Sequence, residues 1–495
     1  MRARDAEPFP RAVLDALDAA ANRPVFEHGD RSVTGGELLD LISRIANGLR
    51  REGLGPGAGV ALLLGVTPEA FATVLAAHVV GARVLGVRPG LPDAQLRHLL
   101  GLDVAAVVTD STGHHAPHLS TAIRSGGRHA PRALTAEALR TARRGPLRVD
   151  GRPGDVARLI HTSGSTGTPK ACAQTYAAMT AGWAARPQEW PPAIRELASR
   201  LDRYLVFGSL SSQVMFEYAV LAIAAGGTVV VADRPELPGA ITRHRASACV
   251  ITVPRLVKLV AAQRRDPADL STLRGLMVSG SPLSPDRHRE ALEVLGPVVF
   301  HGYGQTETGM IAMATPADPP GSVGVPPAAV DVEVRDADGA PVPPGVDGEL
   351  FVRTPSQAAA YWGDPERSAE VFTAGWVRTR DLGHLDADGC LHLTGRTRDV
   401  VIVNANLHHV GPIERAIAEH PDVAEAYVVA APDEDTGEAV HAYVVPTGDR
   451  APDLAALRAL VTARLGPACA PVRVTAIAEP PLAPSGKPDK RLLHP

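Results

Sequence analysis

The stretch LIHTSGSTGTPKA (residues 159–171) alternates small hydroxyl residues with glycines and ends in one cation, Lys170. Leu159 and Ile160 end a predicted strand just before it. Glycine permits unusual φ values and close approach, so the N–H groups and hydroxyls of such a loop can turn toward an anion. The lysine adds a point charge suited to a phosphate. We interpret the stretch as a phosphate-binding loop, and an ordinary Ser/Gly turn is the alternative.

The spacing of this loop excludes one large class of phosphate-binding proteins. A Walker A loop has the pattern G-x-x-x-x-G-K-[ST]. Here Lys170 follows a proline and precedes Ala171. A P-loop NTPase is therefore disfavoured.

Length and composition indicate an ordinary globular protein of two or more domains. The chain has 495 residues, of which 45% are hydrophobic and 21% charged, with a net charge of −4. That balance gives no electrostatic case for a nucleic-acid or membrane partner. Aromatic residues make up only 4%, which also argues against a base-stacking surface.

The cysteines and the N-terminus favour a cytoplasmic location. The cysteines lie far apart and lack metal-ligand spacing, so reduced thiols are the simplest interpretation. They are Cys172, Cys249, Cys390 and Cys469. The first twenty residues carry charges and prolines but no sustained apolar run, so they predict neither a signal peptide nor a membrane span.

Alternating strand and helix patterns predict an α/β fold in the first part of the chain. GVALLLGV (59–66) reads as a buried strand, PEAFATVLAAHVVGA (68–82) as a helix and RVLGVRPGL (83–91) as the next strand. Thr34 is a predicted helix cap. The alternation resumes after the loop and favours a largely parallel sheet. Residues 111–150 show little periodicity and are predicted to be a surface connection, and residues 173–185 a helix.

The later part of the chain changes character twice. Turn signals and apolar alternation predict a β-rich subdomain at about residues 320–397. Residues 412–478 then give helix, strand, strand, helix and strand, which predicts a small α+β domain. We therefore expect a large N-terminal domain at 1–397, with parallel α/β sheets and the β-rich subdomain, and a small mobile C-terminal domain at 398–495.

Further motifs follow the first loop in a fixed order. HGYGQTE occupies 301–307, WVRTRDLGHLDADG contains Asp381, GRTRD begins at Gly395, and PLAPSGKPDKRLL closes the chain with Lys487. Together with TSGSTGTPK, these stretches resemble the adenylate-forming enzymes, which include acyl-CoA synthetases, peptide-synthetase adenylation domains and luciferases. The resemblance covers almost the whole chain.

This resemblance implies a set of nucleotide-binding residues. Tyr303 would lie against adenine, Asp381 and Arg396 would hold the ribose, Thr306 the α-phosphate, and Glu307 a Mg²⁺ ion that neutralises phosphate charge. Without the family, Tyr303 reads equally well as a core aromatic and Glu307 as a surface acid. The other predicted nucleotide contacts are Thr162, Ser163, Gly164, Ser165, Thr166, Gly167, Lys170, Gly280 and Gly304.

The resemblance also implies a mechanism. A substrate carboxylate would attack the α-phosphorus of ATP and release pyrophosphate, and positive charge would bring the two anions together. Lys487 would bridge carboxylate and α-phosphate, so the predicted catalytic residues are Lys487, Thr306 and Glu307. The small domain would then swing about Arg398, the predicted hinge, to admit an acceptor.

The substrate and the acceptor stay open at this stage. The stretch GSLSSQVMFE (208–217) lacks the aspartate by which amino-acid-activating members hold an α-amino group. It favours a small or polar-substituted aromatic acid, with Ser212, Gln213 and Ser281 as predicted pocket residues, in a secondary-metabolite pathway. Ala405 replaces the glycine that CoA-using members usually carry.

Three acceptor chemistries and one non-enzymatic alternative follow. Transfer to CoA or a carrier-protein thiol is the main expectation, amide formation with an amine is the first alternative, and ATP-dependent activation of nitrite for an aryl amine is the second. A non-catalytic nucleotide-binding scaffold is disfavoured because Lys487, Glu307 and Asp381 are all present.

Overall fold

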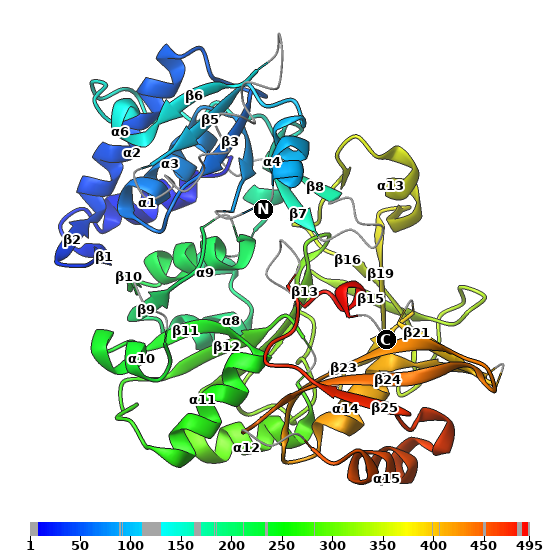
Figure 1. The fold of residues 1–495 in the computed structure, drawn as a ribbon. Coiled ribbons are helices and arrows are strands. Elements are labelled where there is room, and N and C mark those ends of the chain that lie inside the picture. Colours follow the sequence, from blue (N-terminus) through cyan, green and yellow to red (C-terminus); the bar gives the residue numbers. More distant parts are fainter. Residues whose placement is uncertain are drawn as a thin grey trace.

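The computed structural model places four β-sheets and their covering helices along the chain (Figure 1). The structure describes residues 8–88, 91, 93–110, 130–162, 170–182, 184, 186–210, 212–232, 236–281, 283–397, 399–404, 406–448, 452–482 and 488–493. Two large sheets form the first part of the chain, a smaller antiparallel sheet follows, and the last sheet belongs to the C-terminal region.

The first large sheet is parallel except at its two edges. Each inner strand is short, apolar and buried, as expected for a parallel sheet covered on both faces. Its eight strands, in spatial order, are β14 (Gly309–Ala314), β13 (Val299–Gln305), β12 (Gly275–Ser279), β11 (Ala248–Thr252), β9 (Arg203–Val206), β10 (Thr228–Val231), β1 (Pro24–His28) and β2 (Arg31–Thr34).

The second large sheet carries the two strands that flank the glycine-rich loop. Strands β7 and β8 pair antiparallel with each other, whereas the strands on the other side of β7 are parallel. In spatial order the sheet contains β17 (Ala360–Tyr361), β8 (Lys170–Thr175), β7 (Val156–Thr162), β4 (Arg83–Gly86), β3 (Gly59–Leu63), β5 (Ala106–Thr109) and β6 (Arg132–Thr135).

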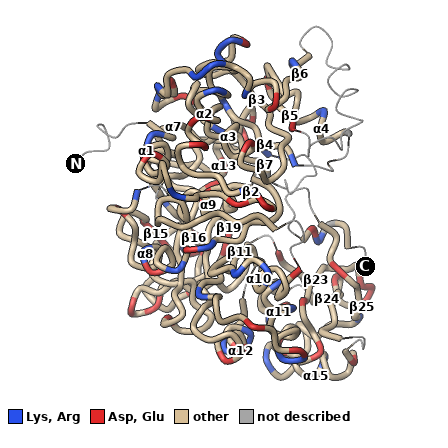
Figure 2. Tube along the Cα trace, turned by 90° about the vertical axis from the view of Figure 1, so that its left-hand side faces the viewer, with Lys and Arg blue, Asp and Glu red and all other residues tan. Residues whose placement is uncertain are grey.

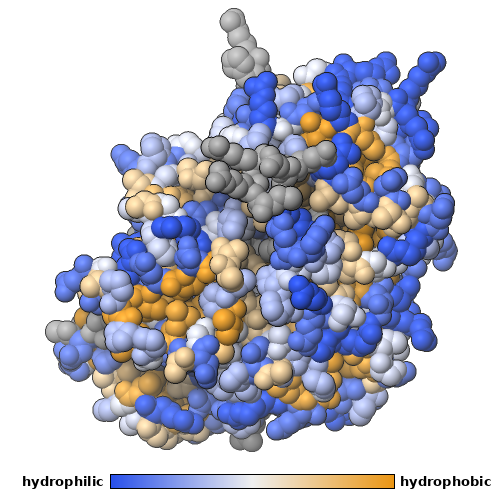
Figure 3. Space-filling model, turned by 180° about the vertical axis from the view of Figure 1, so that it is seen from behind, coloured by the Kyte–Doolittle hydropathy of each residue, from blue (hydrophilic) through white to orange (hydrophobic). Residues whose placement is uncertain are grey.

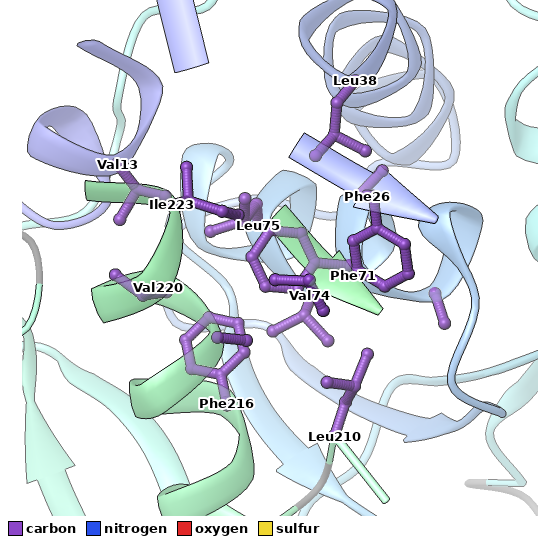
Figure 4. Close-up of a cluster of buried hydrophobic side chains, with 14 of the residues drawn as sticks. Val13, Phe26, Leu38, Phe71, Val74, Leu75, Leu210, Phe216, Val220 and Ile223 are labelled. Atoms are coloured by element: carbon purple, nitrogen blue, oxygen red, sulfur yellow. The ribbon is translucent and has the colours of Figure 1, made fainter. Parts of the chain in front are cut away.

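Helices α3 (Pro68–Val79) and α9 (Gln213–Ala224) join the two large sheets through one apolar cluster. Both helices are apolar nearly all round, which is typical of helices buried on every side. Figure 4 shows Phe216 and Val220 of α9 beside Phe71 and Val74 of α3, and the rings of Phe71 and Phe216 are 5.6 Å apart. This cluster fixes α9 against the loop-bearing sheet.

The other helices of this part cover the outer faces of the sheets (Figure 1). A capping box begins α2, because the Thr34 hydroxyl accepts from the Glu37 N–H while the Glu37 carboxylate accepts from the Thr34 N–H, which confirms Thr34 as a cap. These helices are α1 (Arg11–Ala19), α2 (Gly35–Arg51), α4 (Asp93–Leu100), α6 (Ala136–Leu139), α7 (Tyr176–Thr180), α8 (Pro192–Ala198), α10 (Gly239–His244), α11 (Val253–Arg265) and α12 (Pro285–Leu295).

Two local predictions are wrong. The segment 173–185 was predicted to be helical, but its first residues continue strand β8, and helix α7 covers only Tyr176–Thr180. Pairing with β7 and β17 on both sides outweighs the helix propensity of these alanines. The segment 111–150 was predicted to be a connection, yet it contains β6 and α6. β6 is an exposed edge strand, so it lacks the apolar pattern that would have revealed it.

The β-rich subdomain is confirmed as an antiparallel sheet with one short helix, α13 (Pro365–Val371). Its main path runs through β15 (Asp331–Arg335), β16 (Gly348–Arg353), β19 (Trp376–Leu385) and β18 (Phe372–Thr373), while β20 (Leu391–Arg396) also pairs with β19. The pairing of β19 with β20 sets Asp381 directly opposite Arg396.

The C-terminal region follows the predicted order of helices and strands. It contains α14 (Val410–Ala418), β23 (Val423–Asp433), β24 (Gly437–Pro446), α15 (Leu454–Leu465) and β25 (Arg473–Ala476), preceded by the hairpin of β21 (Val400–Val403) and β22 (Asn406–His409). The chain leaves one sheet at Arg396 and enters the next at Val400. The change of sheet spans the predicted boundary at 397, which stays a prediction.

The surface shows no preference for one sign of charge in the view of Figure 2, where basic and acidic residues are interspersed along the chain. On the face in Figure 3, apolar residues form separate areas bordered by hydrophilic ones. Among the described residues, no helix combines the length and apolarity that a membrane crossing requires.

Candidate active site

A buried carboxylate, Asp381, joins three of the sequence motifs. Its side chain accepts hydrogen bonds from the Tyr303 hydroxyl at 2.6 Å and the Gln305 amide at 2.5 Å, both on Oδ2. Arg396 donates from Nε to Oδ1 at 2.8 Å. Strands β13, β19 and β20 therefore meet at one charged group, which is only 5% exposed. The structure thus brings together Tyr303, Asp381 and Arg396, as the motifs predicted.

The tyrosine of this cluster is a hydrogen-bond donor rather than a second charge. Burial, followed by the adjacent charge of Asp381, raises the pKa of Tyr303 well above its usual range. Its ring packs in an apolar cluster with Ile311 and Val323, while its hydroxyl reaches the carboxylate. Tyr303 is thus a core aromatic, as the alternative interpretation had it, and also a member of the polar cluster.

The Asp381 cluster can receive a diol if one present donor yields its place. A carboxylate offers about four lone-pair sites, and three are already used here. Two further O–H donors need one of these partners to move. The side chain of Arg396 is 61% exposed, whereas Tyr303 is buried. Arg396 is therefore the partner that can swing away when two hydroxyls approach Asp381.

A second carboxylate, Glu307, lies in the turn after β13. The hydroxyl of Tyr361 donates to Oε1 of Glu307 at 2.7 Å, and the Nζ atom of Lys170 lies 4.6 Å from the centre of the Tyr361 ring. Pairing of β17 with β8 sets Tyr361 opposite Cys172, two residues after Lys170. The end of the glycine-rich loop and the Glu307 turn are thus held side by side.

Glu307 fits a Mg²⁺ site of the kind in which a substrate supplies most ligands. Mg²⁺ beside phosphates is usually bound through one or two carboxylates plus phosphate oxygens. Within the described ranges, no group of three or more His, Cys, Asp or Glu side chains could hold a metal by itself. Burial and then the charge of Glu307 raise the pKa of Tyr361, so its hydroxyl stays protonated and donates a hydrogen bond that orients the carboxylate.

Two predicted glycines have clear conformational reasons. A Cβ atom at Gly304 would lie 2.3 Å from the carbonyl oxygen of Gly309, because β13 and β14 approach closely there. Gly280, directly after β12, has φ of +99°, which favours glycine. A side chain would therefore clash with the neighbouring strand at position 304 and would strain the backbone at position 280.

Several predicted residues lie outside the described part of the chain. The backbone of Thr162 ends β7 opposite Lys170, but its side chain is not described. Thr306 lies partly buried in the turn after β13. The predicted site residues outside the described ranges are Ser163, Gly164, Ser165, Thr166, Gly167, Arg398 and Lys487.

A pocket opens beside the Glu307 turn, between α9 and strands β7 and β8. Its hollow amounts to about 500 Å³ when the solvent at its open mouth is counted. Gln213, one of the predicted pocket residues, lines it, whereas Ser212 and Ser281 line neither this pocket nor its neighbour. The lining residues are mostly apolar or small and include Phe9, Met179, Gly182, Ala184, Phe216, Val220, Gly309 and Met310.

The pocket also contains polar residues that sequence reasoning missed. Arg158 of β7 donates to the Gln174 amide oxygen at 2.7 Å and to Oε1 of Glu217 at 2.8 Å. Gln213 donates to the same Glu217 oxygen at 2.9 Å. Four residues from three elements thus form one network. The available signal was Arg158, a charged residue that stands between apolar residues in the strand before the glycine-rich loop.

Tyr361 was also missed. It lies in the segment YWGDPE (361–366), where aromatic residues precede a Pro-led helix start. In a chain with so few aromatic residues, this pair was a usable signal.

Fold and site together define a class: a multi-sheet α/β protein in which the β-rich subdomain contributes Asp381 to one carboxylate cluster, while Lys170 lies beside a second cluster at Glu307. The sequence profile of the AMP-binding enzyme family matches residues 14–362, and that of the AMP-binding enzyme C-terminal domain matches 412–487. The chain belongs to the AMP-binding enzyme family. The predicted adenylate-forming resemblance, fold class and ligase class are confirmed.

Curated relatives include acid–CoA ligases. The feruloyl-CoA synthase of Amycolatopsis sp. is 34% identical, over 85% of this chain and 84% of that protein. The medium/long-chain-fatty-acid–CoA ligase FadD8 of Mycobacterium tuberculosis is 30% identical, over 97% of this chain and 89% of that protein. Among solved structures, the amide bond synthetase McbA of Marinactinospora thermotolerans has a TM-score of 0.85 at 34% identity, with 98% of each chain covered.

Proposed function

We propose that this protein uses ATP to adenylate a small carboxylic acid, releases pyrophosphate, and transfers the acyl group to an acceptor. The Asp381 cluster is the observation that carries this proposal. It joins residues from three separate motifs at one buried carboxylate, beside an exposed arginine that can yield to a ribose diol. A structural role alone would not require the arginine of this pair to be exposed.

The residues around the phosphates would offset the repulsion between two anions. In this proposal, Lys170 and the loop 162–167 would contact the pyrophosphate, and Thr306 would contact the α-phosphate. Glu307, oriented by Tyr361, would hold Mg²⁺. When bound, this ion supplies positive charge to the phosphate oxygens. Donors fixed in advance stabilise the charge that develops at phosphorus without a further cost of reorganisation.

Lys487 would complete the reaction centre. Its ammonium group would lie between the substrate carboxylate and the α-phosphate, where it favours the approach of both anions. The match of the C-terminal family profile, which ends at residue 487, supports placing this lysine in the family's tail motif. Arg398 would act as the hinge about which the residues from 398 onward turn after adenylation.

A thiol, either CoA or a carrier protein, is the first proposed acceptor, and the named CoA ligases among the relatives support it. An amine is the second candidate, which would make the protein an amide synthetase. One observation favours it: the amide bond synthetase is 34% identical over nearly the whole of both chains. The replacement of the expected glycine by Ala405 points the same way.

The test measures pyrophosphate release with ATP and Mg²⁺ across a panel of carboxylic acids. CoA, a simple amine, or nitrite with an aryl amine is added in parallel. Acid-dependent release supports adenylation, and the acceptor that converts a single turnover into many identifies the second step. Release with nitrite and with no acid would overturn the proposal and favour nitrite activation. No release under any condition would favour a nucleotide-binding scaffold.

A further inference from the structure

The pocket between α9 and strands β7 and β8, to which the proposed function assigns the acid, contains a charged pair that adenylation does not need. We call this pocket the acid pocket. Arg158 is 8% exposed and is bound to Glu217 at 2.8 Å. Burying two charges costs several kcal/mol each unless other groups compensate. Apolar residues of similar size would be less costly here. A functional role would explain why a charged pair stands at this position.

Only one of the two carboxylate oxygens of Glu217 accepts hydrogen bonds within the network. Both hydrogen bonds from Arg158 and Gln213 reach Oε1 of Glu217. Oε2 has no hydrogen-bond partner among the residues that the structure describes. Because Glu217 lines the pocket, a bound ligand can supply the missing donor. An unpaired acceptor in such a site favours ligands that bring a donor.

Gln174, which supports Arg158, is itself held by hydrogen bonds at both atoms of its amide group. The Gln174 amide accepts from Arg158 and donates to the carbonyl oxygen of Ser356 at 2.6 Å. Arg158 and Gln174 also face each other across β7 and β8. This rigid support holds the Glu217 carboxylate in place rather than leaving it to turn toward water.

Charge and shape narrow the class of ligand. Arg158 and Glu217 form a net neutral pair, so a second charge of either sign in the ligand would face a like charge nearby. The rest of the wall consists of aromatic rings, methionines and small residues, as in Phe9, Phe216, Met179 and Met310. Thioethers and rings pack well against a flat aromatic group.

Resting on the proposed adenylation, we infer that the acid is aromatic and carries a neutral N–H or O–H donor, which Glu217 accepts on Oε2. The carboxyl group of such an acid would lie toward Glu307, and its donor toward α9. Glu217 is then a specificity-determining residue, while Arg158 and Gln174 are positioning residues that hold it.

The test uses matched acids that differ in one donor. Indole-3-carboxylate is compared with benzothiophene-3-carboxylate, and 3-hydroxybenzoate with 3-methylbenzoate, by kcat/KM for pyrophosphate release. A hydrogen bond to a charged acceptor is worth a preference of about 10- to 100-fold for the acid with the donor. Ratios near one in both pairs would overturn the inference while leaving the proposed function intact.

A double variant separates specificity from folding. Removing one partner alone would leave a buried unpaired charge and could unfold the chain. The double variant Arg158→Met/Glu217→Leu replaces the pair by apolar groups and should reduce the donor preference to near one while adenylation of the donor-free acids continues. A preference that survives in this variant would contradict the role of Glu217.

The control variant is Arg203→Met/Glu27→Leu. This ion pair joins β9 to β1 at 2.8 Å, is partly exposed, and lines neither pocket. It should keep the wild-type preference, and equal loss in both double variants would assign the effect to stability. If none of the acids releases pyrophosphate in the wild-type protein, the proposed function fails and this inference with it.

Discussion

Two carboxylates of the site, Asp381 and Glu217, differ in how many hydrogen bonds they accept. Asp381 has three donors and is almost fully buried, so its position is fixed before any ligand arrives. Glu217 has two donors on one oxygen and none on the other among the described residues, and its side chain is 23% exposed. A carboxylate whose acceptor sites are nearly all used, such as Asp381, suits a ligand that the whole family binds. A carboxylate with one oxygen left for a ligand, such as Glu217, suits a ligand that is particular to one protein.

The largest expected effect concerns the lysine that would meet both reactants. Lys487→Ala should lower the rate of pyrophosphate release by about 100- to 1,000-fold, because a positioned charge at the reacting phosphate is lost. Single-turnover release measures it. The matched control is Lys258→Ala, which removes an exposed lysine from α11. A wild-type rate in Lys487→Ala would remove this lysine from the reaction centre.

The next largest effect concerns the buried carboxylate of Asp381. Asp381→Asn keeps the shape but loses the charge that, in the proposed function, would accept from ribose hydroxyls, so KM for ATP should rise about 10- to 100-fold. The preference among acids should stay unchanged, because Glu217 is untouched. Asp347→Asn is the control, since this exposed aspartate pairs with His384 in the same subdomain. An altered acid preference with an unchanged KM for ATP would show that Asp381 contacts the acid rather than ATP, which would contradict the account.

A smaller effect should follow from loosening Glu307. Tyr361→Phe removes the hydroxyl that orients this carboxylate and should raise the Mg²⁺ concentration needed for half-maximal activity by roughly 10-fold. Tyr427→Phe is the matched control, because the Tyr427 hydroxyl donates to Glu425 in the C-terminal region. If activity depends on the Mg²⁺ concentration in the same way for wild type and Tyr361→Phe, Glu307 does not bind the metal.

A further effect, on stability rather than activity, concerns the pH dependence of unfolding at His78, beside the pocket. Burial, and then the nearby charge of Arg158, lowers the pKa of His78 to about 3. The unfolded chain takes up a proton near pH 6.5 that the folded chain refuses until about pH 3. This group's contribution to the free energy of unfolding is thus fully present above pH 6.5 and is lost as the pH falls.

For one such group the loss is about 2 kcal/mol between pH 7 and pH 5. His78→Leu should therefore lose less stability than the wild type over this interval, as measured by denaturant unfolding at both values. Equal losses would show that His78 is already charged in the folded protein at pH 5.

The residues of the Asp381 cluster could be identified from the sequence more readily than those of the pocket, because Tyr303, Asp381 and Arg396 each stand in a contiguous motif. Pairing of β19 with β20 sets Asp381 opposite Arg396, whereas Tyr303 reaches Asp381 from β13 of another sheet. The acid pocket instead depends on how α9 packs against β7 and β8, a long-range arrangement that no local pattern encodes. Gln213 was predicted to line the pocket, but Arg158, Gln174 and Glu217 were not.

The missed strand β8 has the same origin. Residues 173–175 of this strand were predicted to begin a helix, and only the pairing of β8 with β7 and β17 makes them a strand. That pairing also brings Lys170 to Tyr361 and Glu307, a contact that spacing along the chain could not predict. Local propensity predicted most elements, while tertiary pairing decided the geometry of the site.

Isotope transfer from the acid to the nucleotide tests the central claim most directly. The protein is incubated with ATP, Mg²⁺, an acceptor and an aromatic acid whose carboxylate oxygens are both ¹⁸O, and the released nucleotide is analysed by mass spectrometry. Attack of the carboxylate on the α-phosphorus predicts AMP that carries one ¹⁸O atom per turnover. Unlabelled AMP, or ADP in place of AMP, would contradict the account.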